Sequence, residues 1–155
     1  MHDGETREYR VYIPASYQAS SPVPLLINFH GGAGDIASQV ALSDMRPIAD
    51  TANFILVYPQ ALPDPNDGGS TLWTHKEPTD VDDVFFVEAL IDQLAMDYSI
   101  NESRVYACGF SNGGEFTFEL ACRLSEKIAA VGVVARSMFI DTFNECSPTL
   151  SLIHI

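Results

Sequence analysis

Residues 104–115 read RVYACGFSNGGE, an apolar run that leads directly into a serine enclosed by glycines. The stretch from Gly109 to Gly113 fits the pattern G-x-S-x-G. Alone the pattern is weak, because it arises by chance in roughly 5% of chains of this length at average glycine and serine usage. Its context strengthens it, since a strand-like run precedes Ser111 and a helix-competent segment follows it. A tight strand-to-helix turn at this place would point the serine hydroxyl away from the sheet.

Strand-like and helix-like segments alternate along the rest of the chain. Residues 24–30 (PLLINFH), 54–60 and 104–110 are continuous apolar runs, typical of central strands covered on both faces. The other predicted strands cover residues 7–14, 129–135 and 149–155, and the predicted helices cover roughly 36–52, 81–98 and 112–124. We therefore predict one α/β domain over residues 1–155, with a mainly parallel sheet and helices on both faces.

Composition excludes several classes of function. The chain has 155 residues and is 46% hydrophobic, which favours a single packed, soluble domain. Eight basic and 21 acidic side chains give a net charge of −13, which disfavours nucleic acid and anionic membrane surfaces as partners. No stretch approaches the roughly 20 apolar residues of a membrane helix, and residues 1–10 lack the charged and apolar regions of a signal peptide.

A second glycine-rich turn, HGGAGD at residues 30–35, follows the apolar run 24–30. In an acyl-transfer site such a turn supplies one backbone N–H to the oxyanion hole, and the residue after the nucleophile supplies the other. We expect the donor from this turn to be the N–H of Gly32, with that of Ala33 as the less favoured choice. The second donor is then the N–H of Asn112, the residue after Ser111. The alternative is a phosphate-binding loop, but G-x-G-x-x-G is not satisfied and no P-loop lysine follows.

Five segments, taken in order, resemble the polyhydroxybutyrate depolymerase and feruloyl esterase group of α/β-hydrolases. They cover residues 2–17, 24–35, 54–60, 81–135 and 146–155, and the match is most specific around SNGG. The resemblance implies hydrolysis of carboxylic esters, of small acyl or aromatic type, by Ser, Asp and His without a metal or cofactor. Many members of the group are secreted, and the compartment of this chain stays open.

The resemblance assigns roles to matching residues. Ser111 becomes the nucleophile, and Asn112 with the Gly31–Gly32 turn forms the oxyanion hole. Trp73 matches an aromatic residue of the family at a place where it can line the substrate cleft, although it can equally pin the loop 61–80 to the core.

Two further groups of matching residues are ambiguous. His30 is a candidate substrate-binding residue, although a histidine beside an oxyanion turn more often holds the loop by hydrogen bonds. Asp82 and Asp83 match a pair in the family, and we interpret them as charges at a helix start.

In this fold the nucleophile is followed by the acid and then the histidine, and after Ser111 the only Asp and His are Asp141 and His154. Asp141 also fits a solvating loop charge, and His154 also fits an ordinary strand histidine. The resemblance places the family's acid and histidine loops beyond residues 149–155. We therefore expect a C-terminally truncated hydrolase domain that lacks the later strands and helices. It is either an esterase or a catalytically silent domain that binds a ligand or partner.

Three cysteines cannot all pair, and they lack the C-x-x-C spacing of zinc or redox sites. The resemblance implies a disulfide between Cys122 and Cys146 and a buried thiol at Cys108, and the alternative is three free thiols. A strand at 149–155 that ends the sheet would leave an edge open to pairing. We therefore expect a homodimer through the C-terminal region, which would also bring a histidine or carboxylate of one subunit toward Ser111 of the other.

Overall fold

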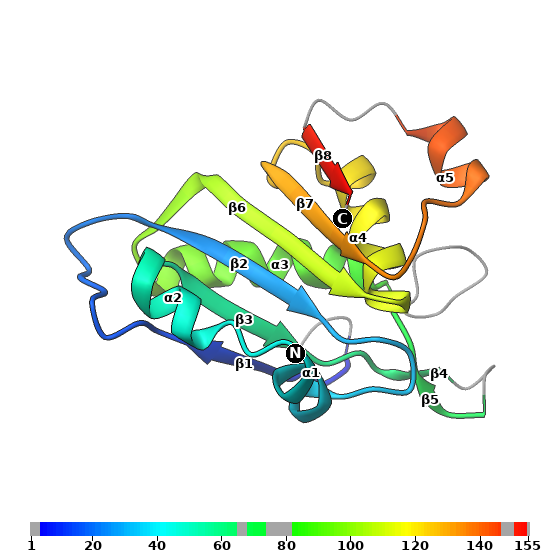
Figure 1. Cartoon of the computed structure of the whole chain (residues 1–155), viewed down its shortest axis with the longest axis horizontal. Helices are drawn as coiled ribbons and strands as arrows, with labels where there is room; N and C mark the ends of the chain where they lie inside the picture. Colours follow the sequence, from blue (N-terminus) through cyan, green and yellow to red (C-terminus); the bar gives the residue numbers. More distant parts are fainter. Residues whose placement is uncertain (1–3, 65–67, 74–81, 147–150, 155) are drawn as a thin grey trace.

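A six-stranded sheet forms the centre of the computed structural model, which describes residues 4–64, 68–73, 82–146 and 151–154. Its strands are β1 (Tyr9–Tyr12), β2 (Val23–Phe29), β3 (Ile55–Pro59), β6 (Ile100–Phe110), β7 (Ala130–Val134) and β8 (Ser151–His154). The order across the sheet is β1-β3-β2-β6-β7-β8 (Figure 1). Only the β1–β3 pairing is antiparallel, and the other four are parallel. The predicted mainly parallel sheet is confirmed.

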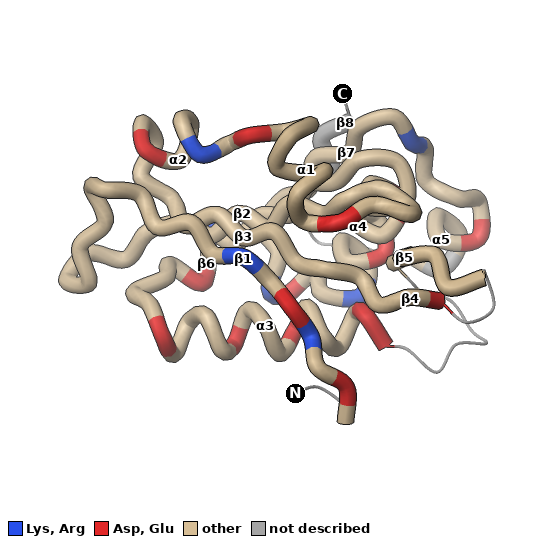
Figure 2. The backbone as a smooth tube through the Cα atoms, turned by 90° about the horizontal axis from the view of Figure 1, so that it is seen from below, with Lys and Arg blue, Asp and Glu red and all other residues tan. Residues whose placement is uncertain are grey.

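Helices cover both faces of this sheet, as the sequence predicts. The helices and the small second sheet are α1 (Ile36–Leu42), α2 (Arg46–Ala52), α3 (Asp83–Asp97), α4 (Asn112–Arg123), α5 (Ile140–Glu145), β4 (Pro63–Asp64) and β5 (Ser70–Thr71). Figure 2 shows α1 and α2 on one side of the sheet and α3 on the other. Among the described residues, no helix is long and apolar enough to cross a bilayer.

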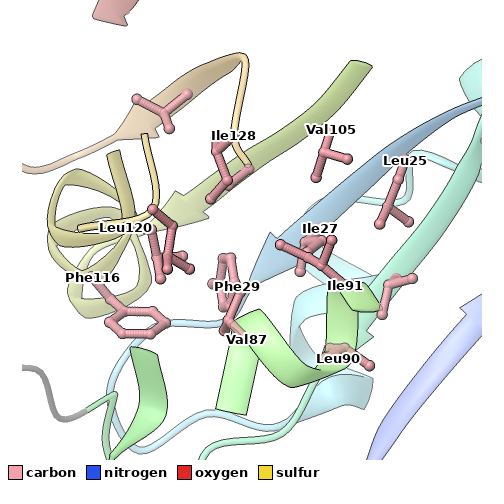
Figure 3. Close-up of a cluster of buried hydrophobic side chains, with 14 of the residues drawn as sticks. Leu25, Ile27, Phe29, Val87, Leu90, Ile91, Val105, Phe116, Leu120 and Ile128 are labelled. Atoms are coloured by element: carbon pink, nitrogen blue, oxygen red, sulfur yellow. The ribbon is translucent and has the colours of Figure 1, made fainter. Parts of the chain in front are cut away.

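Alternating side chains of the central strand divide the core into two clusters. Leu25, Ile27 and Phe29 of β2 belong to the larger cluster, with residues of α3 and α4 (Figure 3). Leu26 packs against the smaller cluster, together with apolar residues of α1 and α2. A parallel strand covered on both faces buries the side chains of both faces, so most of its positions are apolar, and the one buried amide of β2, Asn28, accepts a hydrogen bond from Gln39 at 2.8 Å. This burial on both faces explains why residues 24–30 form a continuous apolar run.

Three elements differ from the prediction. The helix expected over 36–52 is wrong: α1 ends at Leu42, and α2 starts at Arg46 with Pro47 in its first turn. Proline has no backbone N–H and its ring clashes with the preceding turn, so it fits a helix start and disfavours one continuous helix. The segment between the predicted strands 129–135 and 149–155, for which no helix was predicted, contains α5, and the loop 61–80 contains the short β4–β5 pair.

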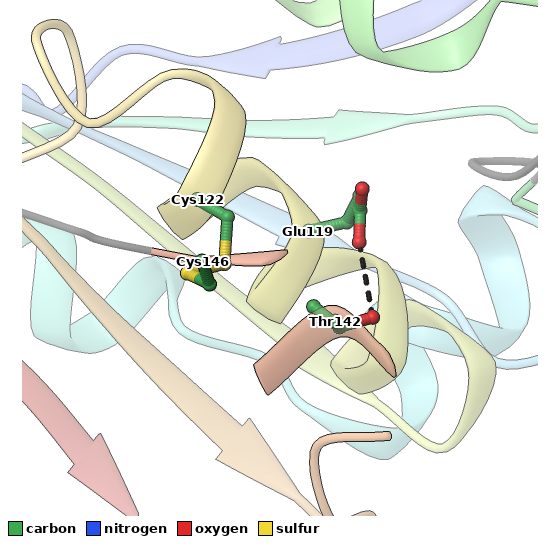
Figure 4. The surroundings of a disulfide bond; sticks show 4 residues. All are labelled: Glu119, Cys122, Thr142 and Cys146. Atoms are coloured by element: carbon green, nitrogen blue, oxygen red, sulfur yellow. Dashed lines mark hydrogen bonds between the residues drawn. A yellow bond between two sulfur atoms is a disulfide. The ribbon is translucent and has the colours of Figure 1, made fainter. Parts of the chain in front are cut away.

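The disulfide between Cys122 and Cys146 is confirmed, with a Cα–Cα distance of 5.2 Å. It ties the segment after α5 to α4, and Thr142 Oγ1 donates a hydrogen bond to Glu119 Oε2 at 3.2 Å beside it (Figure 4). These contacts between elements hold a six-residue helix that has little stability alone. Cys108 is a free thiol in β6, and burial raises the pKa of this thiol to about 12.

Candidate active site

Ser111 lies at the turn from β6 to α4, with φ 52° and ψ −119°. A positive φ is uncommon for a residue with a Cβ atom and marks local strain. Two backbone hydrogen bonds hold the turn: Ser111 N–H donates to Val134 O of β7, and Ser111 O accepts from Glu115 N–H, both at 3.0 Å. Among the described residues, no hydrogen bond uses Ser111 Oγ. The serine therefore stands in the strained strand-to-helix geometry that G-x-S-x-G predicts.

Gly109 and Gly113 allow the backbones around this serine to approach closely. A Cβ atom on Gly109 would lie 2.3 Å from Gly113 O, and one on Gly113 would lie 2.4 Å from His30 O. No side chain fits at these distances. Both glycines of the pattern are therefore required for α4 to begin directly against the ends of β6 and β2.

The turn at residues 30–35 lies against the serine turn. A Cβ atom built on Gly31 would be 3.5 Å from Ser111 Cβ, and one built on Gly32 would be 3.6 Å from Asn112 Cβ. Ala33 N–H already donates to Thr71 O at 2.8 Å, which removes Ala33 as an oxyanion donor. In the described part of the chain, no hydrogen bond uses the N–H of Gly32 or of Asn112. The structure thus places residues 32 and 112, whose N–H groups have no partner among the described residues, close to each other beside Ser111.

His30 is buried, with 1% of its surface exposed. Its Nε2 accepts a hydrogen bond from Ala61 N–H at 3.1 Å, so the ring proton lies on Nδ1, which donates to Gly31 O at 2.7 Å. Burial lowers the pKa of His30 below its ordinary value and keeps the ring neutral. We therefore replace the substrate-binding interpretation of His30 with a structural one: the ring holds the glycine turn.

Trp73 is also 1% exposed, which does not support the idea that it lines the cleft. Its ring stacks on Phe116 at a centroid distance of 5.2 Å and meets Phe29 edge-on at 5.0 Å. Its Nε1 donates to His30 O at 2.9 Å, and its backbone N–H donates to Asn112 Oδ1 at 2.8 Å. The alternative interpretation, a large side chain that pins its segment to the core, agrees with this geometry.

The described residues show no contact between the candidate acid Asp141 and the serine, and they place only the backbone of the candidate base His154. Asp141 lies exposed in the first turn of α5, and none of the hydrogen bonds between described residues connects it to Ser111. His154 pairs with Val133 of β7, which in turn pairs with Gly109 of β6. Two strand spacings place the backbone of His154 about 10 Å from that of Gly109. The His154 side chain lies outside the described part, so both roles stay predictions.

A buried charge next to the serine was not expected from the sequence. Glu115, in the first turn of α4, is 7% exposed, and its Oε2 accepts from Arg136 Nε at 3.1 Å. Arg136 follows β7, so the pair links the two segments that also share the Ser111–Val134 hydrogen bond.

The aspartates at the start of α3 have different roles. Asp82 is the N-cap and accepts from Phe85 N–H at 3.0 Å, as a charge at a helix start should. Asp83 is fully buried and pairs with Arg7 at 2.5 Å. The sequence contained a signal for the burial of Asp83 but not for its partner, because Asp83 falls four residues before Val87 on the apolar face of the helix. Residue 81 of the predicted helix and residues 149, 150 and 155 of the predicted last strand lie outside the described residues.

Comparisons with known proteins find esterases. No family model matches the chain. A bifunctional acetylxylan esterase/xylanase from Neocallimastix patriciarum is 33% identical over 127 residues, which are 82% of this chain and 17% of that protein. A probable feruloyl esterase C from Aspergillus niger is 29% identical over 140 residues, 87% of this chain and 48% of that protein. The solved acetyl xylan esterase from Aspergillus awamori matches with a TM-score of 0.65 at 20% identity, covering 81% of this chain and 45% of that one. This chain thus spans about half, or less, of the length of these proteins.

Proposed function

We propose that this chain, a feruloyl esterase-like α/β-hydrolase, hydrolyses carboxylic esters through an acyl-enzyme on Ser111. The observation that carries the proposal is the positive φ of Ser111 at a strand-to-helix turn, with two unused backbone N–H groups beside it. The names of the relatives support esters as substrates, and small acyl or aromatic esters remain our proposal for the substrate class. The resemblance to polyhydroxybutyrate depolymerases stays a prediction, because the relatives named above are feruloyl and acetylxylan esterases.

In the proposed reaction, Ser111 Oγ attacks the carbonyl carbon of the ester and loses its proton to a base. The carbonyl oxygen becomes negatively charged and accepts hydrogen bonds from the N–H groups of Gly32 and Asn112. The alcohol leaves with a proton, and water then releases the acid and restores the serine. Asn112 is the first residue of α4, so the positive end of the helix dipole favours the same negative charge. Each donor contributes about 3 kcal/mol in comparable sites.

We propose His154 as the base and Asp141 as the acid, on the order of residues along the chain and on the strand register. His154 lies on a strand parallel to β6 and two positions across the sheet. Histidine gains and loses a proton near neutral pH, which suits a general base. Replacing either residue by alanine should slow acylation of Ser111, and unchanged acylation in both variants would remove them from the mechanism.

A fluorophosphonate probe tests the nucleophile directly, because it bonds only to activated serines. We expect the wild-type chain to bind one probe per chain and Ser111→Ala to bind none. Ser103→Ala is the matched control, since its exposed hydroxyl donates a hydrogen bond to Asn101 Oδ1 on β6, and it should label like the wild type. Labelling that survives Ser111→Ala would reject the assignment. A wild-type chain that neither labels nor releases one acyl equivalent from p-nitrophenyl acetate would favour a catalytically silent, ligand-binding domain.

We also propose that the chain forms a homodimer through its C-terminal region. β8 stands at one end of the described sheet and pairs with β7 on one side. The free side of an edge strand is a template for pairing with a second chain. Light scattering tests the proposal, and a monomer at micromolar concentration would contradict it.

A further inference from the structure

Residues 70–73, which we call the clasp, contact the glycine turn without belonging to it. Thr71 O accepts a hydrogen bond from Ala33 N–H at 2.8 Å. Thr71 Oγ1 donates to Gly34 O at 2.6 Å. Thr71 therefore holds the turn 30–35 at two adjacent residues, Ala33 and Gly34.

The same segment also holds the start of α4. The Trp73 backbone donates its N–H to Asn112 Oδ1 at 2.8 Å and accepts from Asn112 Nδ2 at 3.3 Å. The Trp73 side chain donates from Nε1 to His30 O at 2.9 Å. Because the ring is buried against Phe29 and Phe116, the backbone of residue 73 has little freedom to move. The clasp thus contacts both segments that carry a proposed oxyanion donor.

The direction of the Gly32 N–H follows from the atoms that hold the preceding carbonyl. Gly31 O accepts from His30 Nδ1 at 2.7 Å and from Gly34 N–H at 3.1 Å. A trans peptide is planar, so the N–H of Gly32 points away from Gly31 O. Gly34 thus supplies one of the two hydrogen bonds that fix the peptide carrying the Gly32 N–H, and Thr71 is bonded to Gly34.

We propose that Thr71 and the Asn112 side chain, joined through the backbone of Trp73, are positioning residues that set the separation of the Gly32 and Asn112 N–H groups. This inference rests on the proposed function and deepens it. The clasp does not touch the substrate in this scheme. Preorganised donors act on the charge that develops in the transition state. Loosening the clasp should therefore lower the rate of the chemical step and leave ground-state binding unchanged.

Two variants remove the clasp contacts without removing a donor. Thr71→Val deletes the hydroxyl and keeps the shape of the side chain. Asn112→Ala deletes both contacts to Trp73 and keeps the backbone N–H at residue 112. In saturation kinetics of fluorophosphonate labelling, we expect the maximal rate to fall about tenfold in each variant, with the half-saturating concentration within about twofold. Thr71→Ser keeps the hydroxyl and should label at the wild-type rate.

Matched controls exist far from the site. Thr51→Val removes a hydroxyl that donates to Pro47 O at 2.9 Å on the exposed face of α2. Asn101→Ala removes an amide oxygen that accepts from Ser103 N–H at 3.1 Å. Both controls should keep the wild-type labelling kinetics.

Hydrogen exchange provides a readout that does not depend on Ser111 chemistry. Ala33 N–H donates to Thr71 O and has no contact with residue 112 among the hydrogen bonds of the described residues. In Asn112→Ala we expect the Ala33 amide to exchange at least about threefold faster, because the freed clasp holds it less firmly. The Asn101→Ala control should leave this amide unchanged.

The outcomes separate the inference from the function on which it rests. A wild-type chain that fails to label refutes the proposed function, and faster Ala33 exchange in Asn112→Ala would then still support a clasp that couples the two segments. Unchanged Ala33 exchange overturns the clasp. An increase in the half-saturating concentration with an unchanged maximal rate also overturns it, because that result would indicate contact with the bound molecule.

Discussion

Replacing Gly113 with alanine should displace α4 from the end of β2 and carry Ser111 with it. The new Cβ atom would lie 2.4 Å from His30 O and 2.6 Å from Phe29 O. Cβ atoms essentially never approach other atoms within 3.0 Å, so one backbone must move by about 0.6 Å. Overpacking of this kind costs about 1 to 3 kcal/mol. We expect the upper end, since both neighbours are backbone carbonyls and cannot rotate away.

Two measurements report the effect of Gly113→Ala. Urea unfolding reports stability, and Trp73 is a convenient fluorescent probe because it is the chain's one tryptophan and is buried in the same region. Fluorophosphonate labelling reports the position of Ser111, and a displacement of this size should slow it by up to about 100-fold. Gly132→Ala is the control: its Cβ atom would lie 3.6 Å from Cys108 Cβ, an ordinary contact. Both substitutions reduce the entropy of the unfolded chain similarly, so their difference isolates the clash.

Equal stability of the two alanine variants, within about 0.5 kcal/mol, would refute the claim that the backbone contact requires glycine at residue 113. A clear loss of stability with wild-type labelling would refute the other half of the reasoning. It would mean that Ser111 keeps its position when α4 moves.

Three further predictions concern stability, each measured by urea unfolding. Replacing both Cys122 and Cys146 with serine should lower the free energy of unfolding by about 3.5 kcal/mol, from the entropy of the loop that the disulfide closes. Because burial lowers the pKa of His30, the folded state binds fewer protons than the unfolded state. His30 should therefore make its full contribution to stability above about pH 6.5. Below that pH the free energy of unfolding should fall, by at most about 1.4 kcal/mol per pH unit. Arg7→Ala should cost about 3 kcal/mol, because it leaves the Asp83 carboxylate buried without this cation.

Each of these predictions has a control. The double serine variant should match the wild-type chain measured under reducing conditions. A His30→Gln variant should lose the decline in stability between pH 6.5 and 5.5, and a decline that persists would assign it to other groups. Arg46→Ala breaks the exposed Asp44–Arg46 pair and should change stability far less than Arg7→Ala. Equal effects of the two arginine substitutions would contradict the argument from burial.

Local patterns in the sequence were sufficient to predict the strands of the sheet and the turn at Ser111. A strand buried on both faces must be apolar at successive positions, and residues 24–30 therefore predict β2 without knowledge of its neighbours. G-x-S-x-G predicts the turn at Ser111 because its two glycines allow a backbone approach that no side chain permits. The same local reasoning missed the break before Pro47. The helical spacing of apolar residues continues across this proline, although the proline lies in the first turn of a new helix.

Only the tertiary structure decided the roles of His30, Trp73 and Asp83. The type of each residue is compatible with a catalytic, a substrate-binding or a structural role. The choice depends on burial and on partners distant in the chain: Ala61 for His30, Asn112 for Trp73 and Arg7 for Asp83. Sequence periodicity reports which face of an element is apolar, but it carries no information on which polar atoms of two remote segments meet inside the fold. The turn that carries Ser111 could therefore be predicted from the sequence, and the contacts that hold this turn in place could not.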